Sequence, residues 1–234
     1  MSGRDENVTS AAEIRPSAHG TIWSDYSTDR FMAPEMSKFT CAEIPDMSDI
    51  DSEQDYWLAN YILNSILGAQ VPSPLRQQWF NFLRRCHSAS YEYVRAREST
   101  IAFLADRQRQ LRYLDAIGHW EAFLTYSWQA YGFLAGGKPL WFKSGDGSVL
   151  ERLHGLQSRV KHSDEAVARG DIVDEGPLCI WMTNEGVRST DMVLSWGELA
   201  KVLHDLATWA STIQNPGTLH EKLAAATHLD DLSE

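Results

Sequence analysis

Residues 109–135 read RQLRYLDAIGHWEAFLTYSWQAYGFLA, and this stretch decides the fold. Its seven aromatic side chains, with leucines between them, are Tyr113, Trp120, Phe123, Tyr126, Trp128, Tyr131 and Phe133. A helix that is apolar on every side lies at the centre of a bundle or is shared with a second subunit. The stretch therefore predicts one long central helix with other helices packed around it.

Two helices are predicted upstream of this central one. Apolar residues recur at three- and four-residue spacing over about 52–68. A longer helix over about 74–106 has Ser73 as its cap and Pro74 at its first position. The apolar seam of this longer helix consists of Trp79, Leu83, Cys86, Ser90, Tyr93, Arg97, Ile101 and Leu104.

Downstream, two capping boxes open further helices, each a serine followed three residues later by a glutamate. Ser148 and Glu151 precede a predicted helix over about 149–169. Ser195 and Glu198 precede the last helix, which carries a clean apolar stripe.

Between these two helices, the short apolar runs 178–183 and 187–194 flank Asn184-Glu185-Gly186 and predict a β-hairpin. Because strands are few and connections short, the predicted fold class is all-α: an up-and-down bundle of four to five helices with a small β-hairpin before the last helix. We expect a helical domain over 51–215 with its hairpin at 178–194, a disordered or irregular acidic arm over 1–50, and an acidic tail over 216–234.

The net charge of −11 over 234 residues is unevenly placed. Residues 1–56 carry 4 basic and 12 acidic groups and residues 170–234 carry 3 and 11, whereas residues 57–169 carry 14 and 9. The whole chain should not bind nucleic acid non-specifically, but its basic middle can bind a phosphate backbone. The alternative is that these arginines are the solvated face of a helix. They are Arg76, Arg84, Arg85, Arg95, Arg97, Arg107, Arg109 and Arg112.

Several classes of protein are not expected. No apolar run approaches the roughly 20 residues of a membrane-spanning helix, and the N-terminal segment lacks the apolar core of a secretory signal. Cys41, Cys86 and Cys179 lie far apart, so we expect a reduced, cytoplasmic protein. Phosphate-binding glycine motifs and HExxH are absent, and there is one Glu-x-x-His, at Glu151 and His154, so we expect no cofactor and no metal.

The helix over 149–169 carries the main candidate site. At 100° per residue, its core stripe is formed by Leu153, Leu156, Val160 and Val167. His162 lies on the opposite stripe, where Gly155 and Ser158 would let another helix approach closely. Histidine takes or gives a proton at neutral pH. The flanking Arg159 can hold a phosphate or stabilise a developing oxyanion.

Two interpretations of this segment stay open. In one, the site cleaves RNA, since the 2′-hydroxyl needs a base and the phosphate needs a cation; His162 and Arg159 supply these, and Glu165 orients the imidazole. In the other, Lys161 and His162 are solvated residues near a helix C-terminus, where cations interact favourably with the helix dipole.

A second pair of titratable residues, His119 and Glu121, lies in the aromatic helix. Two positions apart, their side chains point in different directions. We expect buried or interfacial hydrogen-bonding residues here. The alternative is a ligand pocket lined by Trp120, Trp128 and Tyr131.

Residues 158–162, Ser-Arg-Val-Lys-His, resemble the Asn-x-x-Lys-His helix motif of HEPN-like proteins, a superfamily of small helical bundles; Ser158 stands where that motif has asparagine. The order of elements over about 52–214 is also similar, with a hairpin before the final helix as in uncharacterised bacterial members. The resemblance implies a homodimer formed through the helices that bear the arginine and histidine. It also implies either metal-independent RNA cleavage in a bacterial defence or toxin–antitoxin system, or binding without catalysis.

We therefore expect a homodimer that binds RNA or a nucleotide and acts as a metal-independent endoribonuclease. The expected catalytic residues are His162, Arg159 and Glu165, and the expected substrate contacts are Lys161, Ser158 and Arg152. The main alternative is a non-catalytic protein-interaction module with acidic termini. A third is an acidic mimic of nucleic acid.

Overall fold

The computed structural model describes residues 25–67, 73–107, 109–136, 142–170 and 176–215. Its helices are α1 (Asp25–Phe31), the 3₁₀ helix η1 (Met36–Lys38), α2 (Ser48–Leu67), α3 (Ser73–Ala105), α4 (Gln110–Ala135), α5 (Val149–Lys161), α6 (Ser163–Arg169) and α7 (Trp196–Ile213). Its strands are β1 (Trp181–Met182), β2 (Gly186–Arg188) and β3 (Val193–Ser195). The all-α class with a small sheet before the last helix is confirmed. The expectations for residues 1–24 and 216–234 lie outside the described residues.

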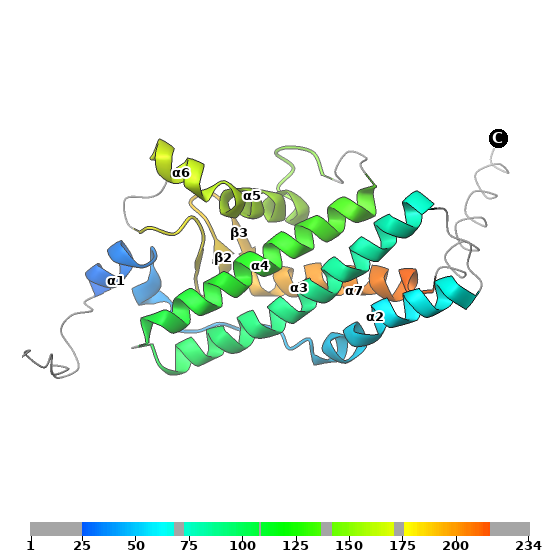
Figure 1. The fold of residues 1–234 in the computed structure, drawn as a ribbon. Coiled ribbons are helices and arrows are strands. Elements are labelled where there is room, and N and C mark those ends of the chain that lie inside the picture. The colour runs from blue at the N-terminus through cyan, green and yellow to red at the C-terminus, as the bar shows by residue number, and fades with distance from the viewer. Residues whose placement is uncertain (1–24, 68–72, 108, 137–141, 171–175, 216–234) are drawn as a thin grey trace, which may run out of the picture.

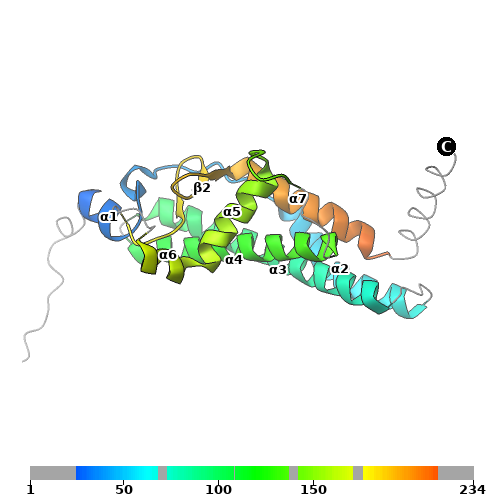
Figure 2. The same cartoon turned by 90° about the horizontal axis from the view of Figure 1, so that it is seen from above.

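Helices α3 and α4 run side by side along the length of the molecule, and α2, α5 and α7 pack on this pair (Figures 1 and 2). Helix α5 packs on α4, α2 packs on α3, and α7 contacts α2, α3 and α4. No helix in the described ranges combines the length and apolar character that crossing a bilayer requires.

Helix α4 is central, as its aromatic sequence predicts. Trp120 is fully buried, and its ring centroid lies 5.5 Å from that of Tyr93, 5.8 Å from Phe123 and 5.3 Å from Trp196. The indole N–H of Trp120 donates to Thr100 Oγ1 at 3.1 Å, so its one polar group is satisfied inside the core. This aromatic cluster joins α3, α4 and α7.

The buried seam of α3 follows the prediction only in its first half. Beyond Tyr93 it runs through Ala96, Thr100 and Phe103, whereas Ile101 on the predicted seam is exposed. The buried side chains keep a seven-residue repeat to the end of the helix, in the two series Trp79, Cys86, Tyr93, Thr100 and Phe82, Ala89, Ala96, Phe103. The predicted seam leaves this repeat after Tyr93, because it takes two successive four-residue steps and reaches Ile101 where the repeat requires Thr100.

The predicted single helix over 149–169 is wrong, because the chain breaks at His162. His162 has φ −110° and ψ 30°, and it separates α5 from α6. Ser163 and Asp164, which follow it, favour helix starts over helix interiors. The break turns Val167 away from the core, and Val167 is 61% exposed rather than part of the predicted apolar stripe.

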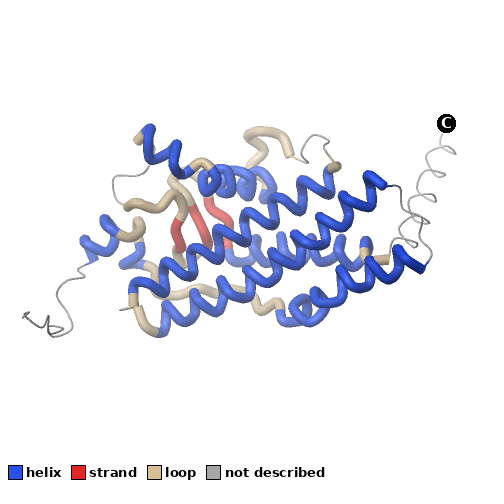
Figure 3. The backbone as a smooth tube through the Cα atoms, viewed as in Figure 1, coloured by secondary structure: helices blue, strands red, loops and turns tan. Residues whose placement is uncertain are grey.

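The predicted two-stranded hairpin is a three-stranded antiparallel sheet in the order β1-β2-β3 (Figure 3). The expected second strand, 187–194, is interrupted by a turn in which the Ser189 N–H donates to the Met192 carbonyl at 2.8 Å. Met192 lies against Gly155 of α5, where a Cβ atom would overlap the thioether. Gly155 therefore makes room for this turn and not for the second helix expected from the sequence.

The segment before α2 contributes to the core through Ala33, Met36, Phe39 and Ile44. The ring of Phe39 stacks on Phe103 of α3 at 5.9 Å. The sequence did not predict α1 or η1, because their apolar residues show no regular period.

Helix α2 packs on the bundle with a different face from the one that its apolar spacing suggests. It buries Ile50, Gln54, Trp57 and Tyr61. The opposite face exposes Tyr56, Ile62, Leu63, Ile66 and Leu67.

Candidate functional site

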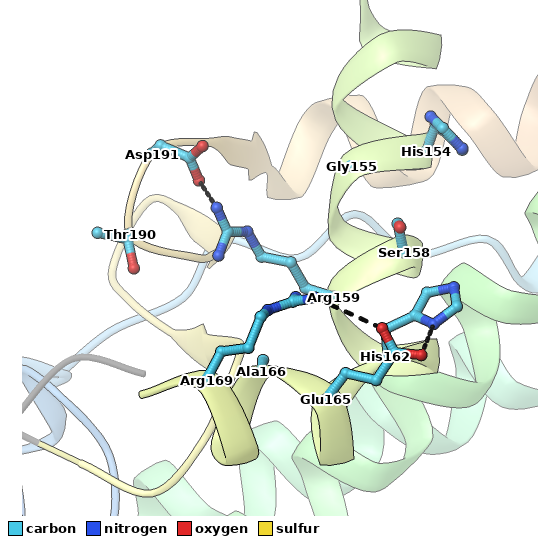
Figure 4. Close-up of a pocket in the computed structure, with 10 residues that line it drawn as sticks. All are labelled: His154, Gly155, Ser158, Arg159, His162, Glu165, Ala166, Arg169, Thr190 and Asp191. Carbon is cyan, nitrogen blue, oxygen red and sulfur yellow. Dashed lines mark hydrogen bonds and ion pairs between the residues drawn. The ribbon is translucent and has the colours of Figure 1, made fainter. Parts of the chain in front are cut away.

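A cleft of about 730 Å³ lies between α5, α6 and the turn that joins β2 to β3 (Figure 4). It is lined by His154, Gly155, Ser158, Arg159, His162, Glu165, Ala166, Arg169, Thr190 and Asp191. This volume is in the usual range for small-molecule sites. Ser158, Arg159, His162 and Glu165, four of the six residues expected from the sequence, come together here.

His162 stands at the break between the two helices, with its side chain 44% exposed. Its Nδ1 lies 3.4 Å from Glu165 Oε1, and the second oxygen of Glu165 lies 3.5 Å from Arg169 Nη1. The break places the imidazole on the cleft wall and brings the carboxylate of the following turn beside it. Glu165 therefore lies beside the imidazole, and its role in orienting His162 stays a prediction.

Arg159 forms an ion pair across the cleft with Asp191, at 2.8 Å between Nη2 and Oδ1. Asp191 also accepts a hydrogen bond from Ser189 Oγ at 3.1 Å, which holds the carboxylate in the turn. An anion that binds in the cleft must share or replace Asp191 as the partner of Arg159. Sequence reasoning missed Asp191 because only the tertiary fold brings this turn against α5.

His154 is a second imidazole in the cleft that sequence reasoning did not place there. Its ring is 4.6 Å from that of Trp128 and 5.6 Å from that of Phe142, so aromatic contacts fix its position. His154, Ser158 and His162 follow one another at four-residue spacing and share one face of α5. That spacing is a sequence signal that could have found His154.

Two of the expected substrate contacts do not line the cleft. Lys161 is exposed next to it. Arg152 donates from Nη1 to the Val193 carbonyl at 2.7 Å, and its Nη2 lies 2.6 Å from Glu198 Oε1. This arginine ties α5 to β3 and α7, which is a structural role.

Glu198, the partner of Arg152, has a shifted pKa. Burial raises the pKa of the Glu198 carboxyl, but hydrogen bonds from Arg152 and Ser195 and the charge of Arg152 outweigh burial. The net pKa is below its ordinary value, so Glu198 is held in its charged form.

His119 and Glu121 point apart, as their spacing predicts, and each has other neighbours. His119 Nδ1 lies 2.6 Å from Glu92 Oε2 of α3. Burial raises the pKa of Glu121, and burial together with the charge of Glu121 raises the pKa of the nearby Cys179 thiol. Trp120 and Tyr131 are buried in the core.

The charges of the cleft balance when its histidines are neutral. Arg159 and Arg169 are offset by Asp191 and Glu165, and protonation of either imidazole makes the cleft positive. No cluster of three or more potential metal ligands occurs among the residues that the structure describes. The chemistry available on this surface is proton transfer by imidazole and charge stabilisation by guanidinium.

No protein-family model, curated protein or solved structure matches the chain. The geometry of the cleft therefore carries the functional argument.

Proposed function

We propose that the protein is an HEPN-like, cytoplasmic RNA-binding protein and that the cleft cleaves RNA without a metal ion. The observation that carries this proposal is the convergence of His162, Arg159 and Ser158 with Arg169 in one open cleft. An imidazole can transfer protons at neutral pH, and a guanidinium group can stabilise the negative charge of a phosphate. A bacterial defence or toxin–antitoxin role is the biological setting that the family resemblance suggests.

In the proposed reaction His162 removes the proton of a ribose 2′-hydroxyl. The 2′-oxygen forms a bond to the adjacent phosphorus, and the bond from phosphorus to the 5′-oxygen breaks. The imidazolium returns its proton to that leaving oxygen. Arg159 stabilises the negative charge on the phosphate oxygens, and Glu165 is a positioning residue for the imidazole. The products are a 2′,3′-cyclic phosphate and a 5′-hydroxyl.

The test is to incubate the protein with total RNA in EDTA. Wild-type protein is expected to cleave the RNA, and His162→Ala is expected to lower the rate by about a hundredfold or more, the usual contribution of a general base. His204→Ala is the matched control, because His204 is exposed on α7 and does not line the cleft. If the RNA is equally intact after incubation with the wild-type protein and with His162→Ala, the proposed ribonuclease activity is refuted.

Binding is tested separately from cleavage. Phosphate contacts release counterions, so the affinity of the cleft for RNA must fall as salt rises. Arg159→Gln is expected to weaken the binding of RNA to the cleft and to make that affinity less dependent on salt concentration. An affinity that does not change with salt would exclude phosphate contacts.

A second candidate function is a non-catalytic protein-interaction module. The observation in its favour is the exposed apolar face of α2, formed by Tyr56, Ile62, Leu63, Ile66 and Leu67. Exposed apolar patches on soluble proteins mark interaction sites. Under this alternative the wild-type protein leaves RNA intact, so the EDTA assay separates the two functions.

A further inference from the structure

The outer face of α3 carries a row of alternating arginine and aromatic side chains. In order they are Arg76, Phe80, Arg84, Tyr91 and Arg95, and all are exposed; Phe80 is 38% and Tyr91 43% exposed. At 100° per residue they fall within an arc of about 100° opposite the buried seam. Helix α3 lies at the front of the bundle in Figure 1, between α4 and α2. We call this row the α3 ridge.

The members of the ridge are four, four, seven and four residues apart. A step of four residues along an α-helix rises about 6 Å and the step of seven about 10 Å, so the whole ridge is about 28 Å long. The guanidinium carbon of Arg95 lies 4.3 Å from the ring centroid of Tyr91, so a cation and an aromatic ring lie next to each other on the ridge.

The ridge is positive in an otherwise acidic protein. Residues 73–98 hold five arginines and two glutamates; Glu92 is engaged by His119 of α4, and Glu98 is exposed beside Arg95 at the end of the ridge. Within the described residues, neither Arg84 nor Arg95 forms an ion pair; Arg84 donates to Asn81 Oδ1 at 3.3 Å, and Arg95 lies over the ring of Tyr91. Arg97, by contrast, donates to the Ile44 carbonyl and lies 3.6 Å from Asp46. The guanidinium groups of Arg84 and Arg95 therefore stay on the helix surface, whereas Arg97 ties α3 to the segment before α2.

A second cavity, of about 630 Å³, opens beside the ridge between the first half of α3 and the last half of α4. Four carboxamide side chains line it, those of Gln77, Gln78, Asn81 and Gln129. Arg85 and Phe133 also line it. The oxygen Oε1 of Gln129 and Nε of Arg85 are buried and have no hydrogen-bond partner among the described residues. Carboxamides both donate and accept hydrogen bonds, as the edges of nucleobases require.

We propose that the α3 ridge and this cavity form a binding site for single-stranded nucleic acid. The arginines contact phosphates, Phe80 and Tyr91 stack on bases, and the carboxamides bind the edge of one base. A single strand is favoured over a duplex because stacking on a side chain requires an unpaired, accessible base. The site is separate from the cleft of α5 and α6 and does not depend on cleavage there.

The experiment measures fluorescence anisotropy with a labelled single-stranded RNA of about ten nucleotides, within the range that one binding surface covers. The double variant Arg84→Glu, Arg95→Glu is expected to weaken binding at least tenfold and to reduce the salt dependence. Tyr91→Ala is expected to weaken binding about fivefold or more. Lys201→Glu, at an exposed position of α7, is a control for one such charge reversal away from the ridge and should bind as wild type does.

Two further measurements separate this site from the cleft. His162→Ala should retain binding through the ridge whether or not the cleft cleaves RNA, and a duplex of the same sequence should bind at least tenfold more weakly. Unchanged affinity of the double variant would overturn the proposal and leave the ridge as a solvated helix face. Equal affinity for duplex and single strand would also overturn it. Circular dichroism of each variant checks that the helices are intact.

Discussion

At the scale of single residues, Gly186 shows how closely two strands approach. A Cβ atom there would overlap the carbonyl oxygen of Leu194 and crowd Cα of Ser195, both of which are backbone atoms that cannot move aside. Gly186→Ala is therefore expected to lower the free energy of unfolding by about 3 kcal/mol, at the upper end of overpacking costs. Urea unfolding measures the change.

The control for this prediction is Gly118→Ala in α4. No atom lies within 4 Å of a Cβ built at Gly118, and alanine is the better helix former by up to about 1 kcal/mol. Gly118→Ala should leave stability unchanged or raise it. Equal losses at Gly118 and Gly186 would contradict the steric account.

A second prediction at this scale concerns Arg152 and Glu198. The pKa of Glu198 is below its ordinary value in the folded protein, so its carboxylate stabilises the fold above the unfolded pKa of about 4.3. This contribution is lost as pH falls through the lower, folded pKa. Glu198→Gln should lower the free energy of unfolding by about 1–2 kcal/mol at pH 7. It should also make the free energy of unfolding fall less steeply as the solution is made more acidic. A variant as acid-sensitive as wild type would contradict this.

The residues of the cleft were partly predictable for a simple reason. Ser158, Arg159, His162 and Glu165 belong to one continuous segment; helical periodicity brings Ser158 and Arg159 near His162, and the break at His162 sets the position of Glu165. Asp191 comes from a turn that only the folded sheet brings to α5. Arg152 was assigned to the substrate because the sequence does not reveal its partner, Glu198.

At the scale of elements, the two capping boxes differ in the structure. Ser195 and Glu198 exchange both hydrogen bonds of the box at the start of α7. Ser148 caps α5 through the Glu151 N–H, but the carboxylate of Glu151 accepts from Gly145 and Gly147. Both starts were predicted correctly, because a cap depends only on residues a few positions apart.

The caps give a prediction about helix stability. Ser195→Ala removes an acceptor for the Glu198 N–H and is expected to cost about 1 kcal/mol of unfolding free energy. Thermal unfolding followed by circular dichroism measures the loss. Ser195→Asp, which restores an acceptor, should recover most of it, and equal stability of wild type and Ser195→Ala would refute the capping role.

The elements that the sequence predicted poorly depend on distant contacts. The break at His162 and the turn at 189–192 lie on two sides of the cleft, and the turn contacts α5 through Asp191 with Arg159 and through Met192 with Gly155. The predicted seam of α3 is wrong near its end because the polar Thr100 is buried, where it accepts from Trp120 of α4, while the apolar Ile101 is exposed. Local propensity fixes where a helix starts, whereas packing decides which face is buried and where a long helix breaks.

At the scale of the whole molecule, the homodimer that the family resemblance implies predicts a particle of about twice the 26.4 kDa chain mass. In a dimer formed through the helices that bear the arginine and histidine, a second copy would cover the face of α5 and α6, where Val167 is 61% exposed. Val167→Glu would place a charge in that interface and should give the monomer mass. Light scattering on both proteins checks this, and a monomeric wild type at all concentrations would exclude the homodimer.

The division of charge also acts at this scale. The acidic flanks keep the overall charge at −11, while arginines gather on α3. An acidic net charge disfavours non-specific binding to nucleic acid, so the proposed binding depends on local cationic side chains. The alternation of charge along the chain was predictable from the sequence, but the separation of structural from exposed arginines required the fold.

The most direct test of the proposed cleavage uses a short RNA in which a single ribose at the cleaved position lacks its 2′-hydroxyl. Without that oxygen no bond to phosphorus can form, so we expect cleavage to stop at this position and to continue elsewhere, leaving 2′,3′-cyclic phosphate ends. Cleavage at the deoxyribose position, or an RNA that stays intact at every position, would contradict the role assigned to His162 and Arg159.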